Sequence, residues 1–413
     1  MSADINQSQD LLTRRQKVMA PSYRLFYEEP VEVVRAEGVW LYGPQGERYL
    51  DFYNNVPVVG HSHPYVVERL HAQALTLNTH TRYLTAPPVE LAERLLATMP
   101  SALGSVIFTC TGSEANDLAI RMSRFATGRR GVIVTDAAYH GTSDLLSGMS
   151  PVTGLPTGPD VYTIHMPEAF DRPEQFGDLV QGAIARMKAD GVAPAALLVD
   201  TIFGSDGVVA DPAGFLASGV AAIHAAGGLF IADEVQPGFG RTGEGMWGFQ
   251  RHGVVPDIVT MGKPMGNGHP VASLVTKREI ADEFVRYQRY FNTFGGNTVS
   301  CAVALAVLDV IEREQLIAHA AEVGAQLKAG LQALAQRHPI MQNVRGAGLF
   351  MSATMASGSV AGRVLNSLRR KGVLIGLAGR GNVSLKIRPP LVITKDEVTY
   401  LLDALDQVLA TEA

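Results

Sequence analysis

Two residue types that can act together in catalysis follow two apolar segments in the middle of the chain. Asp233 and Glu234 come directly after the run LFIA, and Lys263 comes directly after the run DIVTMG. Each run has the length and the apolar character of a buried strand. Because open α/β sheets gather ligands at the carboxyl ends of their strands, we expect the acid and the lysine to meet at one edge of a sheet.

A lysine that meets a carboxylate in this way suits pyridoxal phosphate. That cofactor forms a Schiff base with a lysine amine, and a carboxylate beside its pyridine nitrogen keeps the nitrogen protonated and the ring an electron sink. We assign these roles to Lys263 and Asp233. Taken singly, the two residues have simpler explanations, since a lysine in a Gly/Pro-rich turn is usually solvated and an acid after a strand often caps a helix.

A turn of small residues offers a site for a phosphate group. The strand-like segment SVIFTCTG leads into a helix that opens at Ser113, so free backbone N–H groups stand at a helix N-terminus. Such groups bind phosphate without any lysine, although an ordinary helix cap has the same pattern. Tyr139 and His140 follow the next strand. An aromatic ring at that position either stacks on a planar cofactor or caps the core.

Two other motifs are weaker. The segment GFGRTG, residues 238 to 243, fits the dinucleotide fingerprint, but more glycines and no helical periodicity follow it, so we predict no dinucleotide site. His61 and His63 form an H-x-H pair with no third ligand nearby, so we predict no metal site.

A basic pair near the C-terminus is a candidate anion site. Lys386 and Arg388 alternate with Leu385 and Ile387, so both basic side chains point to one face of a strand. The pair is either solvated or positioned, and the double proline that follows ends the strand sharply and favours the second interpretation.

The composition suits a soluble α/β enzyme. The 413 residues carry a net charge of −5, which gives no basic field for nucleic acid or an anionic membrane. Cys110 and Cys301 stand in apolar segments, and we predict that both are buried free thiols. With no apolar signal core and no membrane-spanning run, we expect a cytoplasmic protein.

The order of expected elements predicts the architecture. Strands alternate with helices through the central part of the chain, which predicts a large domain with a mostly parallel sheet flanked by helices. We expect residues 66–300 to form this domain, and residues 301–413 to form a smaller α+β domain together with the N-terminal segment, residues 1–65. Residues 1–20 are expected to form a polar arm or helix, and residues 298–337 one long helical stretch.

Five motifs in sequence order resemble those of the class III pyridoxal-phosphate aminotransferases, which have fold type I: GSEAND, AYHG, IADEVQPGFGRTG, MGKPMGNGHP and TFGGN. The similarity runs from about residue 22 to the C-terminus. It implies a homodimer with shared active sites, in which Thr293 reaches the phosphate of the neighbouring subunit's cofactor. The other cofactor-binding residues that it implies are Gly112, Ser113, Tyr139, His140, Asp233, Gln236 and Lys263.

One departure from the aminotransferase pattern concerns the substrate. Many members of the family carry a mobile arginine for the substrate carboxylate, paired at rest with a glutamate, whereas here Lys386 and Asp200 stand at these positions. A point charge replaces a bidentate fork, which is compatible with a phosphate. Four segments resemble those of phospho-lyases of the family: NNVPVVGHSHPYVV, LNTHTRYL, DIVTMGKPMGNGHPVAS and LKIRPP.

The expected reaction is therefore elimination of phosphate from O-phosphoethanolamine or a related amino phosphate. The alternative is amino transfer from an ω-amine or β-amino acid to a keto acid, because both reactions use the same cofactor residues. Arg82 is the first candidate to hold the substrate phosphate. The further candidates are Ser22, Tyr23, Asn55, Lys386 and Arg388.

Overall fold

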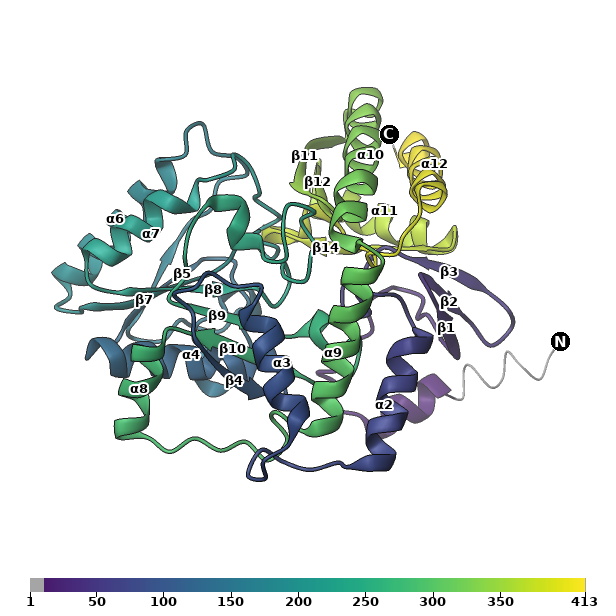
Figure 1. The fold of residues 1–413 in the computed structure, drawn as a ribbon. Helices are drawn as coiled ribbons and strands as arrows, with labels where there is room; N and C mark the ends of the chain where they lie inside the picture. Colours follow the sequence, from purple (N-terminus) through teal and green to yellow (C-terminus); the bar gives the residue numbers. More distant parts are fainter. Residues whose placement is uncertain (1–10, 413) are drawn as a thin grey trace.

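Three β-sheets with packed helices form the molecule, which is described here for residues 11–412 by a computed structural model (Figure 1). The prediction for residues 1–20 lies partly outside this range. Residues 11–18 are helical, as the second half of that prediction expects.

The largest sheet has seven strands in the order β4-β10-β9-β8-β7-β5-β6. Strands β5 to β9 pair in parallel, and only β10 runs antiparallel to both of its neighbours. The prediction of a mostly parallel sheet is confirmed. The strands are β4 (Ser105–Thr109), β5 (Gly131–Thr135), β6 (Val161–Ile164), β7 (Pro194–Asp200), β8 (Leu229–Asp233), β9 (Ile258–Met261) and β10 (Ala272–Thr276).

Helices cover both faces of this sheet (Figure 1). On one face α4 (Gly112–Thr127) and α8 (Arg278–Tyr287) pack with one alternate set of strand residues, and on the other α6 (Gln175–Ala189) and α7 (Leu216–Ala225) pack with the other set. Because both faces of the sheet are buried, the strand sequences are continuous apolar runs and do not alternate between apolar and polar residues.

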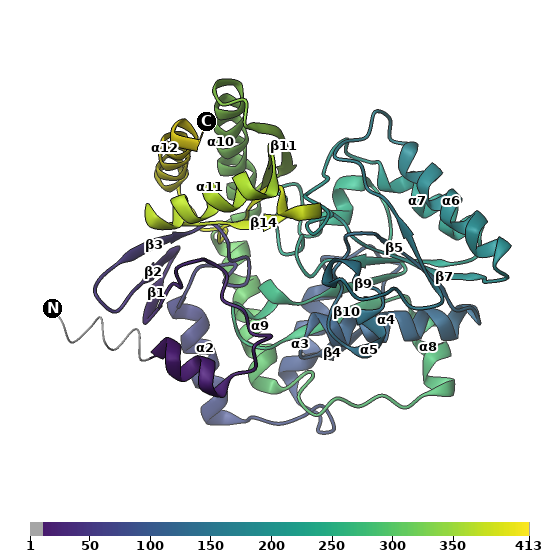
Figure 2. The ribbon, with the colours of Figure 1, turned by 180° about the vertical axis from the view of Figure 1, so that it is seen from behind.

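The N-terminal segment pairs with the C-terminal part of the chain. Strands β1 (Arg35–Glu37), β2 (Trp40–Tyr42) and β3 (Arg48–Asp51) form a sheet that β13 (Val373–Leu374) completes by pairing with β3. In the view from behind, the purple N-terminal strands lie beside the yellow-green helix α11 (Gly358–Arg370) (Figure 2). This pairing agrees with a small domain built from both ends of the chain; its boundaries at residues 65 and 300 stay predictions.

The third sheet belongs to the C-terminal region and has the order β11-β12-β15-β14. Its elements and helices are α10 (Leu316–Arg337), β11 (Met341–Ala347), β12 (Phe350–Met355), β14 (Gly376–Ala378), β15 (Ser384–Ile387) and α12 (Lys395–Glu412). The remaining helices are α2 (Pro64–Thr76), α3 (Ala86–Leu96), α5 (Asp144–Ser147), α9 (Thr298–Arg313) and the short η1 (Pro151–Thr153), η2 (Gly248–His252), η3 (Lys263–Gly266) and η4 (Arg380–Asn382).

The prediction of one helical stretch over residues 298–337 is wrong in one respect, because the stretch is two helices. Helix α9 ends at Arg313 and α10 begins at Leu316, with Gln315 between them in the left-handed region at φ 51°. The two helices serve different layers, since α9 packs on α2 and α3 and α10 packs on β11 and α12. Helical periodicity alone does not record such a change of partner.

The carboxyl ends of three parallel strands position the site. In the sheet register, Asp200 at the end of β7 pairs with Asp233 at the end of β8, and Asp233 pairs with Thr260 in β9. Lys263 then begins the short helix η3, directly after β9. The acid and the lysine predicted from the sequence therefore leave neighbouring strands at the same edge.

Candidate active site

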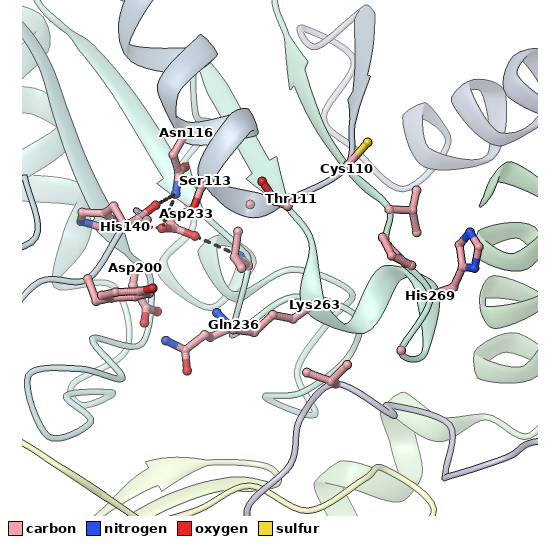
Figure 3. Close-up of a pocket in the computed structure, with 18 residues that line it drawn as sticks. Cys110, Thr111, Ser113, Asn116, His140, Asp200, Asp233, Gln236, Lys263 and His269 are labelled. Atoms are coloured by element: carbon pink, nitrogen blue, oxygen red, sulfur yellow. Dashed lines mark hydrogen bonds and ion pairs between the residues drawn. The ribbon is translucent and has the colours of Figure 1, made fainter. Parts of the chain in front are cut away.

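A cavity of about 380 Å³ lies at this edge of the large sheet (Figure 3). It is lined by every residue predicted to bind the cofactor except Thr293. The predicted residues that line it are Gly112, Ser113, Tyr139, His140, Asp233, Gln236 and Lys263. Strand order and chain crossovers have thus gathered these residues from four separate segments.

Asp233 is held by three hydrogen bonds at the floor of the cavity. Its Oδ2 accepts from Asn116 Nδ2 at 2.9 Å and contacts His140 Nδ1 at 2.7 Å, and its Oδ1 accepts from the Val235 N–H at 3.0 Å (Figure 3). Burial by itself would raise the pKa of Asp233, but His140, the Val235 N–H and the nearby Lys263 together hold that pKa below its ordinary value. Asp233 is therefore an ionised carboxylate in a buried site.

Asn116 is the residue that the sequence analysis missed. Its amide nitrogen donates to Asp233 and to the His140 carbonyl, both at 2.9 Å, while its oxygen accepts from Thr260 Oγ1 at 2.6 Å. It joins α4, the loop after β5 and strands β8 and β9 in one network. The signal that could have found it is its position three residues after Ser113, which places both on one helix face.

Lys263 projects its amine into the same cavity. Burial lowers its pKa, and the charge of Arg388 lowers it further, against the opposing influence of Asp233 and Asp200. No hydrogen bond or ion pair to another of residues 11–412 occupies the amine. A lysine of lowered pKa without a partner is a nucleophilic amine, as a Schiff-base lysine must be.

Helix α4 begins beside the cavity with two free backbone donors. Its cap is formed by Thr111, whose side chain accepts from the Glu114 N–H, and Glu114 in turn accepts from the Cys110 and Thr111 N–H groups. The ordinary capping box is therefore present, but it leaves the N–H groups of Gly112 and Ser113 without an acceptor among the described residues. Both residues line the cavity, where these N–H groups suit a phosphate.

Small residues keep the cavity open beside these donors. A Cβ atom at Gly112 would meet the Val235 side chain at 2.8 Å, and one at Gly262 would come within 3.3 Å of the Gly112 nitrogen. Cys301 is buried as predicted, whereas Cys110 is only partly buried because it lines the cavity.

The candidates for the substrate phosphate fall into two groups. Asn55, Lys386 and Arg388 are buried, and Arg388 Nη1 donates to Asn55 Oδ1 at 3.0 Å and to Gln236 Oε1. This guanidinium is therefore fixed against a cavity residue.

Ser22, Tyr23 and Arg82 are exposed and do not line the cavity. The Arg82 guanidinium lies 3.8 Å from the centre of the Phe291 ring, two residues before Thr293. Thr293 lines a neighbouring cavity, which shares Cys110, His269 and Pro270 with the first one. The structure thus puts Arg82 and Thr293 on one surface, outside their own chain's cavity.

The structure also shows the surroundings of the His61/His63 pair and of residues 238–243, where no site was predicted. His61 contacts Asp51 at 2.8 Å and His63 contacts Glu314 at 3.4 Å, so the two histidines turn to separate carboxylates. Residues 238–243 form a series of turns that leads to η2 instead of opening an α-helix. Among residues 11–412, no helix combines the length and the apolar character needed to cross a membrane.

Comparison with known proteins decides the family. A family model described as aminotransferase class-III matches residues 24–409. The chain belongs to this family. The resemblance, the fold type and the pyridoxal-phosphate cofactor predicted from the sequence are thereby confirmed.

Relatives within the family carry different activities in their names. The ethanolamine-phosphate phospho-lyase homolog 1 of Caenorhabditis elegans is 33% identical over 98% of this chain and 94% of that protein. The mitochondrial alanine–glyoxylate aminotransferase 2 homolog 2 of Arabidopsis thaliana is 36% identical over 98% of this chain and 87% of that protein. Sequence identity alone does not separate a lyase from an aminotransferase here.

Solved structures resemble the whole chain. A phospholyase from Arthrobacter in complex with phosphoethanolamine has a TM-score of 0.93 and 42% identity, covering 97% of this chain and 99% of that one. An aminotransferase from Bacillus anthracis has a TM-score of 0.90 and 26% identity, covering 98% and 99%.

Proposed function

We propose that the protein is a pyridoxal-phosphate-dependent lyase that releases phosphate from O-phosphoethanolamine or a related phosphorylated amine, giving acetaldehyde, ammonia and phosphate. The observation that carries this proposal is Lys386, a buried amine without a partner among residues 11–412, at the position where many aminotransferases carry a carboxylate-binding arginine. A compact positive charge binds a phosphate well but lacks the fork that matches a carboxylate. The likeness to a phospholyase in complex with phosphoethanolamine supports the same substrate class.

Different residues around the cofactor site have different roles in the proposed reaction. Bound pyridoxal phosphate supplies an electron sink for negative charge at the carbon next to the substrate nitrogen. Asp233 holds a proton at the pyridine nitrogen, and Asn116 and His140 fix that carboxylate in place. The Lys263 amine, with its lowered pKa, takes the proton from the substrate carbon.

The buried basic groups would receive the substrate phosphate. Arg388 is oriented by Asn55 and Gln236 and lies 5.1 Å from the centre of the Tyr53 ring, so it cannot swing freely. Lys386 lies on the same strand face two residues earlier. A fixed cation stabilises charge that develops on a leaving phosphate without a cost of reorganisation during the reaction.

We also propose a homodimer in which Arg82 and Thr293 serve the partner's site. Both lie outside their own cavity and close to each other, and large apolar side chains around them are exposed: Tyr83 by 64%, Leu84 by 98% and Phe294 by 69%. A cluster of exposed apolar side chains marks an interaction surface. A second copy would cover it and bring Arg82 to a phosphate.

A hybrid of two inactive variants tests this arrangement. A dimer with one Lys263→Ala chain and one Arg82→Ala chain has one site with an intact Lys263 and, if Arg82 acts across the interface, an intact Arg82. We expect mixing to restore phosphate release well above either variant alone. If Arg82 acts within its own chain, the mixture stays inactive.

The second candidate function is amino transfer from an ω-amine or β-amino acid, which the 36% identity to an alanine–glyoxylate aminotransferase 2 homolog favours. The two functions differ in their need for an acceptor. With O-phosphoethanolamine and no keto acid, a lyase releases phosphate and acetaldehyde in equal amounts over many turnovers. An aminotransferase stops after one turnover, and that result would contradict our proposal.

A further inference from the structure

Lys386 is a buried lysine that has no counter-charge in direct contact. The residue is 6% exposed, and no hydrogen bond or ion pair joins its amine to another of residues 11–412. The amine lies 5.5 Å from the centre of the Phe350 ring, over an apolar surface. An isolated buried ammonium is costly, so this amine favours the neutral form until an anion arrives.

Four ionisable groups influence the charge of Lys386. Arg388 directly after β15 and Lys263 in η3 repel its positive form, whereas Asp200 at the end of β7 and Asp206 in the turn that follows attract it. Burial and then Arg388 dominate, and together they place the pKa of Lys386 well below its ordinary value. The local balance is therefore short of negative charge.

The Lys386 amine is packed close to Asp200. A Cβ atom added at Gly204 would meet Phe350 Cζ at 2.8 Å, Asp200 Oδ2 at 3.1 Å and Lys386 Nζ at 3.5 Å, so these three groups surround Gly204. Asp200 itself lines the cavity that contains Lys263. Lys386 therefore lies one side chain away from the cofactor site.

The proposed reaction needs a proton at this place. When the carbon–oxygen bond of a phosphate monoester dianion breaks, its electron pair stays on oxygen and the group would depart as the strongly basic PO₄³⁻. A proton donor lets it depart as HPO₄²⁻, and such donors contribute roughly 10²- to 10⁴-fold to a rate. Lys263 is occupied with the proton that it takes from the neighbouring carbon.

We propose that Lys386 takes up a proton when the substrate phosphate binds and donates it to the departing phosphate oxygen. This role rests on the proposed lyase function. The carbon–oxygen bond breaks, the pair left on the adjacent carbon forms the carbon–carbon double bond, the departing oxygen gains the proton, and Lys386 returns to the neutral amine. The negative charge of the substrate phosphate thus favours the protonated form of Lys386, and that form is the acid that protonates the departing oxygen.

Sulfate provides a measurement that does not depend on turnover. Sulfate stays a dianion near neutral pH, so protons taken up on its binding enter the protein. We expect calorimetry of the holoenzyme in two buffers of different ionisation heat to show uptake approaching about one proton per sulfate. The uptake should vanish in Lys386→Met, which keeps the side chain's bulk, and persist in Lys188→Met, which alters an exposed lysine on α6. Equal uptake in Lys386→Met and the unaltered enzyme, or none in either, would overturn the proposal.

A change of leaving group tests the donor step. Chloride departs from 2-chloroethylamine without a proton, so Lys386→Met should lower the rate with O-phosphoethanolamine by about 100-fold or more but the rate with 2-chloroethylamine only a few-fold. Equal losses with both substrates would mean that Lys386 is structural. If the unaltered enzyme releases no phosphate from O-phosphoethanolamine, the lyase function and the donor step both fail, while the sulfate titration still decides whether Lys386 is the proton acceptor for a bound anion.

Discussion

Asp233, which lines the cavity, and Lys386, which lies behind Asp200, are two buried ionisable groups with opposite surroundings. Asp233 accepts three hydrogen bonds and has a pKa below its ordinary value, whereas Lys386 has no hydrogen-bond or ion-pair partner in the described part of the chain and a pKa well below its own. The first group is charged before any ligand binds, and the second lacks the counter-charge that would keep it charged. A cofactor that stays bound is matched by a carboxylate that is always ionised. A substrate that binds and leaves is matched by an amine whose protonation changes when the anion binds.

Removal of the Lys263 amine should have the largest effect on the cofactor side. Lys263→Ala is expected to lower turnover by roughly 10³-fold or more, because in the proposed mechanism this amine removes the substrate proton. Trapping with borohydride should label position 263 in the unaltered enzyme and no lysine in the variant. Labelling of another lysine in the unaltered enzyme would reassign the site.

Neutralising the preorganised acid should come next. Asp233→Asn keeps the shape and the His140 contact but loses the charge, which in the proposed mechanism keeps the pyridine nitrogen of the cofactor protonated. We expect turnover to fall by about 100-fold or more while cofactor content stays near that of the unaltered enzyme. Comparable turnover in the variant would show that the charge of Asp233 is not needed.

The cofactor side of this comparison could be predicted from the sequence, and the substrate side only in part. Asp233 and Lys263 follow apolar runs that end at one sheet edge, so strand periodicity and parallel topology suffice to bring them together. Asn116 has partners 24, 117 and 144 residues away, and no local pattern reports them. The same holds for the isolation of Lys386, which depends on side chains from β7, β12 and η3.

The sequence also did not predict that Arg82 lies on the surface. The residue type suggested a phosphate ligand, but its exposure and its contact with Phe291 follow from how two distant loops meet. The break at Gln315 is a further case, since apolar residues continue with helical spacing across it. Periodicity records which residues are buried and leaves open which layer buries them.

Loss of the Asn116 bridge should weaken the preorganised side without removing its charge. Asn116→Ala leaves Asp233 Oδ2 with one fewer donor and leaves Thr260 Oγ1 without its acceptor. We expect a loss of roughly 1–3 kcal/mol in the free energy of unfolding by urea, together with about a 10-fold fall in turnover. Asn116→Asp is a matched variant, and it should be the poorer of the two because it adds a carboxylate beside Asp233.

The smallest effect concerns Asp206, a further buried carboxyl on the substrate side. Thr135 Oγ1 donates to its Oδ2, while its Oδ1 is buried without a partner among the described residues. Burial raises its pKa from 3.8 to about 7. Between these values the folded chain binds the proton more tightly than the unfolded chain, so its contribution to stability falls as the pH rises toward 7 and then levels off.

Asp206→Asn removes this dependence, because the amide can still accept from Thr135 and carries no charge. We expect the variant to be more stable than the unaltered protein by roughly 1 kcal/mol or more at pH 8 and close to it at pH 4, as measured by urea unfolding at both values. A gain that is equal at both values would exclude titration of Asp206 as its cause. Asp206 also attracts the protonated form of Lys386. The proton uptake that accompanies sulfate binding should therefore weaken in Asp206→Asn, because part of the negative charge that favours protonated Lys386 has been removed.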